Sequence, residues 1–576
     1  MRSELMIRVT GEAGQGLKTI GNLLCKIFRR SGWNLFANQD YMSRIRGGNN
    51  FFQIRVSNKP VCCTREKCDL IVALDKDSVG IHRKDLNESG RMIADLQKFG
   101  IENDPQYIDI PLFDIAQKIG GNDIYINSVA CGMISALAGV NFASVKKELE
   151  MTFARKGADI IEKNIHAAFS GYEKVNSQAK DCGFVLKEDP EKTGMLIDGN
   201  DAIGISAIVS GCKFYSGYPM TPSTGIMEFI ARYADRFNIV VEQAEDEIAA
   251  VNMVIGASYA GVRSMTSTSG GGFALMTEAL SLAGMTETPI VIVDAQRPGP
   301  ATGFPTRTEQ ADIDFLINAG HGEFARAVLS PGTIEEAFYL TNKAFYLADK
   351  YQIPVLLMTD QHLADSYRNV DLFDISRINN EHFIISKEAS VHVNNYKRYA
   401  LTQTGISPRA IPSWIADVIY ADSDEHTEEG HITEDADVRI QMVQKRFYKK
   451  MEGLQQEVEE PVAYKVDDAD MILIGYGSTF GAINEVCRSE TNLGFIHLPQ
   501  VWPFPASRFQ QLIKKGKKLL TVEGNAGGKL AKLIKMETCI EVNGSILRYD
   551  GRPINRDYLL SKLAEELKHG SSNLSK

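Results

Sequence analysis

Four segments in the middle of the chain carry the residue types that do chemistry. They read YPMTPST (218–224), QAEDE (243–247), TSTSGGG (266–272) and QRPGPATGFPTRTEQAD (296–312). Their hydroxyls, acids, glycines and arginines could bind an anion, transfer a proton or hold a cofactor. Each segment follows a short apolar run that could form a strand. The positions of these strands therefore decide whether the four segments come together in one site.

The first of these segments is a stiff turn. Pro219 and Pro222 each fix φ near about −65° and remove a backbone donor. Thr221, Ser223 and Thr224 then offer hydroxyls and free N–H groups at the start of a helix, where an anion is favoured. The alternative is a well-capped crossover without a ligand, and only the neighbouring segments favour a site.

Three consecutive acids, Glu245, Asp246 and Glu247, stand at the start of the next predicted helix. An acid there can transfer a proton, or it can simply complement the helix dipole. The pattern by itself does not choose among the three.

A glycine-rich turn, GEAGQGLKT, lies near the N-terminus at residues 11–19. A P-loop is disfavoured because Leu17 separates Gly16 from the Lys-Thr pair. A dinucleotide fingerprint is disfavoured because Thr19 fills its third glycine position, although Gly14 and Gly16 are present. We favour a general glycine turn whose N–H groups could still hold a phosphate.

An arginine-containing loop precedes the alternating strand pattern at residues 49–57. It places Arg44 and Arg46 before a Gly-Gly pair. An anion site and a solvated loop joined to a hairpin strand are about equally favoured here.

An acidic segment, DSDEHTEEGHITEDA, occupies residues 422–436 and contains His426 and His431. A metal site is one interpretation. The acids outnumber any reasonable ligand set, so a solvated acidic loop is favoured.

The composition is that of a soluble globular protein, with 44% hydrophobic and 24% charged residues. The net charge of −10 argues against nucleic acid and anionic membranes as partners. No apolar run approaches the ~20 residues of a spanning helix. Nine cysteines without a CxxC pair argue against a disulfide framework and against a bound iron–sulfur cluster. The sequence predicts a cytoplasmic protein.

Strand and helix patterns alternate tightly from residue 198 to about 362, which predicts a doubly wound parallel sheet. The predicted strands are 239–242, 264–268, 289–295, 324–329 and 354–359, and the predicted helices are 246–260, 272–283 and 334–350. Because ligands of such sheets bind at the carboxyl ends of the strands, the four chemical segments are expected to converge there.

At 576 residues the chain is too long for one core. We predict an α/β fold with three α/β domains. The boundaries are 1–180 for an N-terminal domain, 181–197 for a linker, 198–385 for the doubly wound domain, 386–464 for an irregular connecting segment, 465–565 for a C-terminal domain and 566–576 for a tail.

Taken in order, these segments resemble the 2-oxoacid:ferredoxin oxidoreductases, thiamine-diphosphate enzymes that oxidatively decarboxylate 2-oxoacids to acyl-CoA. GEAGQG and RIRGGNNFFQIR resemble the motifs of the family's γ domain, and SGYPMTPST resembles its YPITPS signature. HLPQVWPFP and VEGNAGG resemble later segments of the α subunit. The resemblance covers nearly the whole chain and implies a large subunit with the γ domain fused ahead of the α domains, most similar to the 2-oxoglutarate type.

The resemblance implies roles for individual residues. Glu247 matches the acid that drives the aminopyrimidine tautomer of thiamine, and Arg297 matches the arginine that binds the substrate carboxylate. Thr221 and Thr306 match positions close to substrate. Arg307 is an alternative cation, although an ion pair within its loop is favoured.

The same resemblance assigns cofactor contacts. Pro219, Ser269 and Gly270 match positions that line thiamine diphosphate, in a pyrimidine-binding domain followed by a transketolase C-terminal-like domain. Gly271 stands where the family usually has proline, which makes the loop more flexible. For the γ domain, the resemblance implies a contact with CoA through Gly14, Gly16 and Arg46.

Part of the active site is absent from the sequence. The family's diphosphate and Mg²⁺ site needs a GDG segment followed by asparagine, and IDGND at residues 197–201 does not supply it. The resemblance therefore implies a β subunit that contributes the diphosphate site, the Mg²⁺ and one [4Fe–4S] cluster. It also implies an (αβ)₂ assembly that reduces ferredoxin.

The implied reaction converts 2-oxoglutarate and CoA to succinyl-CoA, CO₂ and reduced ferredoxin. The alternatives are the same chemistry on pyruvate, branched-chain or aryl 2-oxoacids. From a different class comes a nucleotide-binding assembly module without catalysis, for which the N-terminal glycine turn would be the site.

Overall fold

The computed structural model describes residues 4–43, 47–178, 188–189, 194–513 and 516–572. These residues form three sheets and divide into two compact units. The first unit contains residues 1–197, 365–372 and 555–576, and the second contains the remainder. The domain boundaries given above stay a prediction, and most of the predicted linker lies outside the described residues.

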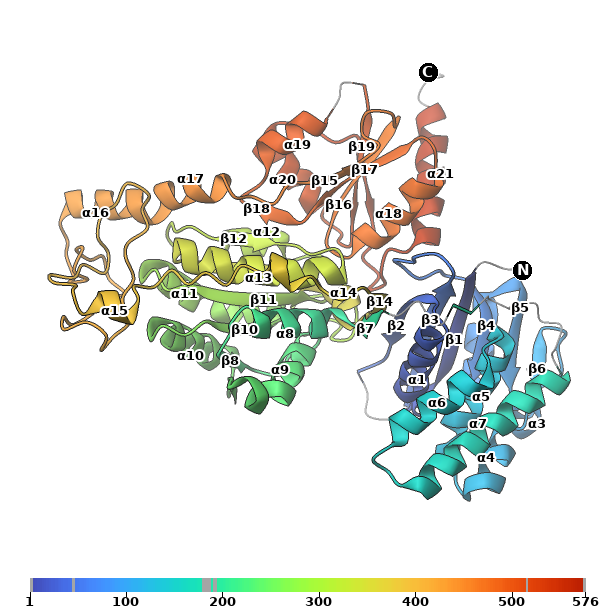
Figure 1. Cartoon of the computed structure of the whole chain (residues 1–576). Helices are drawn as coiled ribbons and strands as arrows, with labels where there is room; N and C mark the ends of the chain where they lie inside the picture. Colours follow the sequence, from blue (N-terminus) through green and yellow to red (C-terminus); the bar gives the residue numbers. More distant parts are fainter. Residues whose placement is uncertain (1–3, 44–46, 179–187, 190–193, 514–515, 573–576) are drawn as a thin grey trace. The chain divides into compact units, whose positions relative to one another are not determined.

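The first unit is built on an eight-stranded mixed sheet (Figure 1). In spatial order its strands are β6 (Tyr107–Asp109), β5 (Leu86–Ala94), β4 (Cys68–Ala73), β1 (Glu4–Ala13), β3 (Gly47–Ser57), β2 (Asn34–Asp40), β14 (Tyr367–Val370) and β7 (Met195–Ile197). Strands β1, β4, β5 and β6 are parallel, whereas β3 is antiparallel to both β1 and β2.

Helices cover both faces of this sheet. They are α1 (Leu17–Arg30), α2 (Lys76–His82), α3 (Leu96–Phe99), α4 (Leu112–Gly120), α5 (Ile126–Ala138), α6 (Phe142–Phe153) and α7 (Ala158–Gln178). Helix α21 (Arg556–Ser572) also belongs to the first unit. The larger core lies under α1 and α5, whose apolar sides meet alternate residues of β1 and β3.

The second unit contains the predicted doubly wound sheet. Its strand order is β18 (Gln500–Trp502), β12 (Ala327–Leu329), β13 (Pro354–Asp360), β11 (Ile290–Gln296), β10 (Ser264–Thr268), β8 (Phe214–Gly217) and β9 (Val240–Gln243). All neighbouring strands are parallel except β18, which is antiparallel to β12. The carboxyl ends of β8, β9, β10, β11 and β13 therefore meet at one edge.

The helices of this domain are α8 (Gly199–Val209), α9 (Thr224–Phe237), α10 (Glu247–Tyr259), α11 (Gly270–Met285), α12 (Ile313–Asn318), α13 (Ile334–Tyr351) and α14 (Gln361–Asp365). Helices α8, α9 and α13 pack on one face of the sheet, and α10 packs against α11 on the other. One core cluster joins α10, α11 and α12 to the C-terminal sheet.

The C-terminal sheet has the order β15 (Val462–Tyr464), β17 (Leu493–Leu498), β16 (Met471–Tyr476), β19 (Lys518–Glu523) and β20 (Gly544–Leu547). Its helices are α18 (Thr479–Ser489), α19 (Ala506–Leu512) and α20 (Lys529–Thr538). Because β18 leaves this domain to pair with β12, the two domains of the second unit share backbone hydrogen bonds as well as a core.

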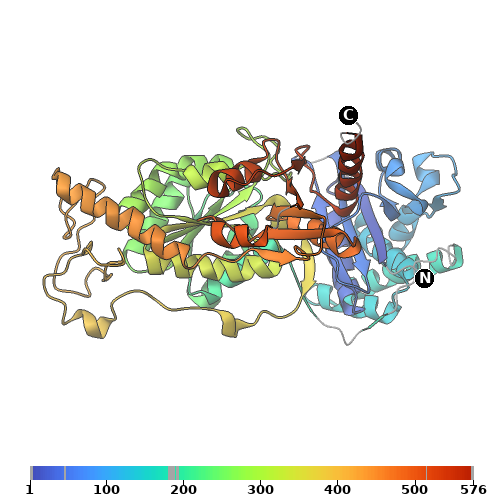
Figure 2. The same cartoon turned by 90° about the horizontal axis from the view of Figure 1, so that it is seen from above.

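A connecting arm, residues 371–460, lies outside the doubly wound sheet and returns as a long helical run (Figure 1; Figure 2). It contains α15 (Lys387–Ser390), α16 (Ala436–Val443), a π-helical stretch (Gln444–Lys449) and α17 (Lys450–Gln455). The interpretation of its acidic segment as a simple solvated loop is wrong for His426. That ring is fully buried and lies 4.0 Å, centroid to centroid, from the ring of Tyr399.

Buried charges fix this arm to the doubly wound domain. Glu287 forms ion pairs with Lys445 and, at 2.5 Å, with Lys450, and all three side chains are fully buried. Burial raises the pKa of Glu287, but the two ammonium groups and Arg398 outweigh it and hold the pKa well below its usual range. The carboxylate thus stays ionised and ties α17 to the end of α11.

Candidate functional site at the edge of the doubly wound sheet

All four chemical segments lie at the carboxyl edge of the second sheet, as predicted. The proline turn follows β8, the acids follow β9, the Ser-Gly loop follows β10, and Arg297 follows β11. The convergence results from parallel pairing, since each strand ends at the same edge.

Glu247 is the first residue of α10 and is only 2% exposed. Its neighbour Asp246 is the N-cap and accepts a hydrogen bond from the Ala249 N–H at 2.8 Å. Burial raises the pKa of Glu247, Asp246 adds to the rise, and Arg297 opposes it. Asp246 therefore caps the helix, the carboxyl group of Glu247 is buried without a capping role, and Glu245 is exposed.

Arg297 connects two of the segments. Its Nη1 donates to the Thr221 carbonyl oxygen at 2.8 Å, which fixes the proline turn to the end of β11. Burial lowers the pKa of the half-buried Arg297 guanidinium, and the Glu247 carboxylate raises it. The two charged groups therefore lie close enough to interact electrostatically. The structure thus brings together Thr221, Glu247 and Arg297.

The remaining predicted site residues differ in exposure. Thr306 is buried, at 8% exposed, and follows Arg297 in the loop formed by residues 297–312. Ser269 is fully buried and is the N-cap of α11, while Gly270 is the helix's first residue. Pro219 is exposed.

Glu247 Oε1 and Ser269 Oγ are among the buried polar atoms at this edge that lack a hydrogen-bond partner within the described residues. A Cβ added to Gly272 would lie 2.3 Å from Glu247 Oε1 and 2.1 Å from Thr268 Oγ1, so the glycine makes room for the carboxyl group. Orphaned acceptors beside a stiff turn fit a heteroaromatic ligand with its own donors and acceptors, such as an aminopyrimidine.

A second acid pair, which the sequence interpretation missed, lies behind these residues. Both carboxylate oxygens of Asp294 and Oδ2 of Asp312 are buried without a hydrogen-bond partner among the described residues. Burial raises the pKa of Asp294 well above its ordinary value, and Asp312 adds to that rise. Burial also raises the pKa of Asp312 to about 6. An aspartate inside the apolar strand IVIVDAQ was the available signal.

Family models match three parts of the chain. They are described as the thiamine-diphosphate-binding part of pyruvate flavodoxin/ferredoxin oxidoreductase (residues 205–445), pyruvate ferredoxin/flavodoxin oxidoreductase (residues 6–174) and core domain II of pyruvate:ferredoxin oxidoreductase (residues 469–557). A 2-oxoacid:ferredoxin oxidoreductase α subunit from Sulfolobus is 32% identical over 98% of this chain and 97% of its own. The chain belongs to the 2-oxoacid:ferredoxin oxidoreductase family.

Two further relatives are named for one substrate. The 2-oxoglutarate synthase subunit KorA of Methanothermobacter marburgensis is 34% identical over 58% of this chain and 88% of its own. The solved 2-oxoglutarate:ferredoxin oxidoreductase of Magnetococcus marinus matches with a TM-score of 0.91 and 29% identity, covering 98% of this chain and all of that one. That structure holds 2-oxoglutarate, CoA and succinyl-CoA.

These relationships confirm the predicted family and the α/β fold, including the thiamine-diphosphate-binding domain. The chain is a subunit of a thiamine-diphosphate-dependent 2-oxoacid:ferredoxin oxidoreductase, which is an enzyme rather than an assembly module without catalysis. In the described ranges no three His, Cys, Asp or Glu side chains group as a metal site requires. None of the helices there has the length and apolar character of a bilayer-spanning segment.

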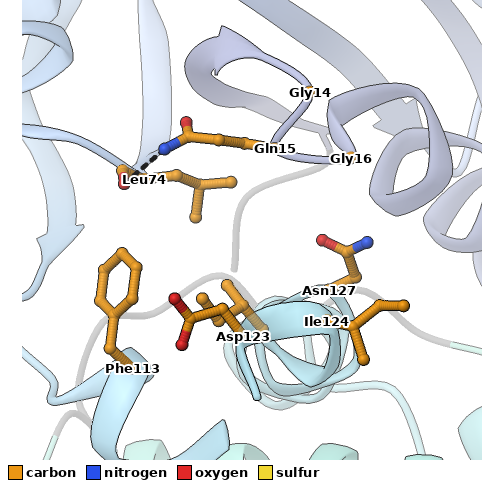
Figure 3. A pocket seen from close by; sticks show the side chains of 9 residues that line it. Gly14, Gln15, Gly16, Leu74, Phe113, Asp123, Ile124 and Asn127 are labelled. Carbon is orange, nitrogen blue, oxygen red and sulfur yellow. Dashed lines mark hydrogen bonds between the residues drawn. The ribbon is translucent and has the colours of Figure 1, made fainter.

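The glycine turn of the first unit lines a cavity of about 290 Å³ (Figure 3). Gly14 and Gly16 have φ of 98° and 77°, which glycine adopts without strain. Gly16 is the N-cap of α1 and has no side chain to cap the helix. Asn127 approaches closely, since a Cβ on Gly16 would lie 2.4 Å from its Nδ2.

The other walls of this cavity are apolar and acidic. Phe113, Asp123 and Ile124 lie across the cavity from the glycine turn, and Leu74 lies beside Gln15 (Figure 3). The side chain of Gln15 is held aside by a hydrogen bond from Nε2 to the Leu74 carbonyl at 3.3 Å. The predicted anion contact Arg46, together with Arg44, lies outside the described residues.

Proposed function

We propose that this chain binds 2-oxoglutarate and the pyrimidine half of thiamine diphosphate, in a complex that converts 2-oxoglutarate and CoA to succinyl-CoA and CO₂ and passes two electrons to ferredoxin. The observation that carries the proposal is the juxtaposition of Glu247, Arg297 and Thr221 at one sheet edge. The relatives named for 2-oxoglutarate support this substrate over pyruvate, branched-chain and aryl 2-oxoacids.

When bound, thiamine diphosphate supplies the carbon nucleophile that attacks a 2-oxoacid. Glu247 would hold a proton at Oε1 for a pyrimidine nitrogen, which its raised pKa favours. Ser269 Oγ would bind a second polar atom of the ring, and Pro219 and Gly270 would line the pocket. The buried position of Glu247 excludes water from that proton.

Arg297 would bind the substrate carboxylate. A guanidinium presents two parallel N–H groups to a carboxylate, and Nη1 is already held by the Thr221 carbonyl. Thr306 would complete the pocket from the 297–312 loop. A 2-oxoacid would then lie between the arginine and the pyrimidine acid.

A β subunit would complete the cofactor site. Asp198 in the segment IDGND is the N-cap of α8 and accepts from the Asp201 N–H at 2.8 Å, which is a structural role. Helices α10 and α11 are apolar on most sides and expose Ile248, Met253 and Leu275 next to the site, which is typical of a covered surface. We place the diphosphate, Mg²⁺ and a [4Fe–4S] cluster on that subunit, in an (αβ)₂ assembly.

CoA would bind in the glycine-turn cavity of the first unit. The N–H groups at the start of α1 and the conformation of Gly14 and Gly16 suit a phosphate, while Phe113 offers an apolar wall. Arg46 is proposed as an additional contact.

Co-expression with the β subunit tests the proposal. The chain alone should be colourless and inactive. The complex should be brown, contain thiamine diphosphate, and reduce a viologen dye with CoA and 2-oxoglutarate faster than with pyruvate, branched-chain or aryl 2-oxoacids. A colourless complex without thiamine would contradict the proposal. A preference for another 2-oxoacid would show that 2-oxoglutarate is not the substrate.

A further inference from the structure

Gln310, near the end of the 297–312 loop, is bound by the C-terminal domain through both its backbone and its side chain. Its N–H donates to the Gly524 carbonyl at 2.7 Å, and its Oε1 accepts from the Gly524 N–H at 3.0 Å. Its carbonyl accepts from Tyr476 Oη at 2.9 Å and from Asn525 Nδ2 at 3.1 Å. Its Nε2 donates to the Tyr476 carbonyl at 3.1 Å. Gln310 is only 2% exposed.

The same amide also contacts the doubly wound sheet. Gln310 Nε2 lies 3.3 Å from Oδ2 of Asp360, the last residue of β13. Both hydrogens of the amide are thus accounted for, one toward each domain. Because these buried hydrogen bonds are made by both the backbone and the side chain, they hold Gln310 in one conformation.

The receiving turn of the C-terminal domain, VEGNAGG at residues 522–528, is itself rigid. Glu523 accepts from the Leu530 N–H at 2.8 Å, and Asn525 Oδ1 accepts from the N–H groups of Gly527 and Gly528 at 3.0 and 2.9 Å. Both Glu523 and Asn525 are essentially fully buried. The hydrogen bonds of the turn therefore hold its shape independently of its contacts with the loop. We call residues 522–528 the VEGNAGG socket.

Glycines of the C-terminal domain, one of them in the 522–528 turn, leave space for the loop. A Cβ on Gly477 would lie 2.7 Å from Gln310 Nε2, and a Cβ on Gly524 would lie 3.2 Å from its Cγ. Farther along the loop, a Cβ on Gly551 would lie 3.2 Å from the Cβ of Arg307. The C-terminal domain therefore contacts the loop at two places, on either side of Thr308.

The other end of the loop is anchored on the sheet. Gln296, the last residue of β11, accepts from the Asp312 N–H at 2.9 Å and donates from Nε2 to the Thr359 carbonyl at 3.1 Å. The loop therefore leaves and re-enters the sheet at one point. Thr306 lies between Arg297 and the second fixed point of the loop, Gln310.

We propose that Gln310 is a positioning residue for the 2-oxoacid and that the VEGNAGG socket of the C-terminal domain sets the geometry of the substrate loop. Gln310 acts through Thr306 and the loop rather than by touching substrate. The inference rests on the proposed function, because it requires the 2-oxoacid to bind between Arg297 and Thr306. It assigns the C-terminal domain a part in substrate affinity.

The test compares Gln310→Ala with Ser330→Ala in the reconstituted complex. Ser330 is the matched control, because its Oγ donates to the Leu498 carbonyl at 2.7 Å between the same two domains but away from the loop. Gln310→Ala should raise the KM for the 2-oxoacid about tenfold and leave the KM for CoA within about twofold. Ser330→Ala should leave both unchanged.

Tyr476→Phe serves as a second variant if Gln310→Ala folds poorly. It removes one hydroxyl donor to the Gln310 carbonyl and should raise the same KM about two- to threefold. An unchanged KM for the 2-oxoacid in a folded variant would overturn the proposal. An equal rise in Ser330→Ala, or an equal rise in the KM for CoA, would also overturn it.

Hydrogen exchange separates this proposal from the proposed function. Peptides covering residues 298–311 should exchange faster in Gln310→Ala than in wild type or Ser330→Ala, whether or not a 2-oxoacid is turned over. Unchanged exchange would remove the anchoring role. If exchange is faster in Gln310→Ala but the wild-type complex turns over no 2-oxoacid, the anchoring role of Gln310 stands and the proposed substrate is refuted instead.

Discussion

Arg297 and Thr221, 76 positions apart in the chain, are joined by a hydrogen bond of 2.8 Å from the guanidinium Nη1 to the carbonyl oxygen. The bond links the end of β11 to the proline turn after β8, and both strands pair with β10 between them. The arginine is thereby held in one orientation before a carboxylate arrives. Under the proposed function this would increase its affinity for the substrate carboxylate, because less rotamer freedom would be lost on binding.

Arg297→Ala should therefore raise the apparent KM for the 2-oxoacid by about 10- to 100-fold, as expected for the loss of charge-assisted hydrogen bonds of ~1.5–3 kcal/mol. Arg297→Lys should recover only part of this loss, because an ammonium lacks the planar fork. Steady-state kinetics of the complex at saturating CoA measure both.

Arg307→Ala is the comparison for this prediction, because Arg307 is the alternative cation in the same loop. It should change the KM for the 2-oxoacid less than about threefold. If Arg307→Ala has the larger effect of the two, the substrate arginine has been assigned to the wrong position.

Glu247→Gln should reduce turnover by about 10²- to 10⁴-fold, the usual range for loss of a general acid or base. The amide keeps the size of the carboxyl group beside Gly272 but cannot transfer its proton in the same way. Assembly with the partner and thiamine content should stay normal. Exposed Glu245→Gln is the control and should keep near-normal turnover. If Glu245→Gln loses turnover and Glu247→Gln keeps it, Glu245 is the catalytic acid instead.

The doubly wound sheet could be predicted because each of its buried strands is a short apolar run between turn signals. The range 264–268 was predicted to the residue, and 290–296 to within one residue at each end. Strands β14 and β18 could not be predicted. They are four and three residues long, and each pairs with a strand far away in the chain, so neither has a local period.

The candidate site was accessible from sequence for a similar reason. Parallel pairing brings successive loops to one edge, so the segments containing Thr221, Glu247 and Arg297 could be grouped before any contact was known. The burial of individual side chains could not be predicted from the sequence. The acidic segment around His426 has a solvated composition, yet that ring packs under Tyr399 because the arm docks through ion pairs made by distant residues.

Asp312 should make the free chain less stable as the pH rises. Its pKa is about 6 in the folded chain, above the ordinary 3.8, so the folded state binds the proton more tightly than the unfolded state. The stabilisation is complete below about pH 4 and is lost as the pH rises through 6.

Asp312→Asn should remove this dependence and increase the free energy of unfolding at pH 7 by about 3 kcal/mol, the equivalent of a pKa raised from 3.8 to about 6. Denaturant unfolding at pH 4, 5, 6 and 7 measures the difference between variant and wild type. The difference should grow with pH. A difference that is constant over this range would show that Asp312 does not carry the shifted pKa.

Gly16→Ala should weaken CoA binding without affecting the 2-oxoacid. Its φ of 77° is strained for alanine, and the new methyl group would collide with the Asn127 amide at the cavity wall. The KM for CoA should rise about tenfold. Gly100→Ala is the control, because Gly100 also has a positive φ of 63° in the first unit but has no atom within 4 Å of the added Cβ. An equal effect of both substitutions would show that backbone strain, and not the cavity, is responsible.

Glu287→Gln should destabilise the second unit by about 3–5 kcal/mol, because it leaves Lys445 and Lys450 fully buried without a counter-charge. Denaturant unfolding of the full chain measures the loss. The triple variant with Lys445→Met and Lys450→Met should recover much of it, since apolar groups of similar length need no partner there. Glu429→Gln, which removes only a half-exposed contact with Lys397 at 3.2 Å, should cost less than about 1 kcal/mol. If the two single variants lose equal stability, the arm is held by its apolar contacts and not by the buried charges.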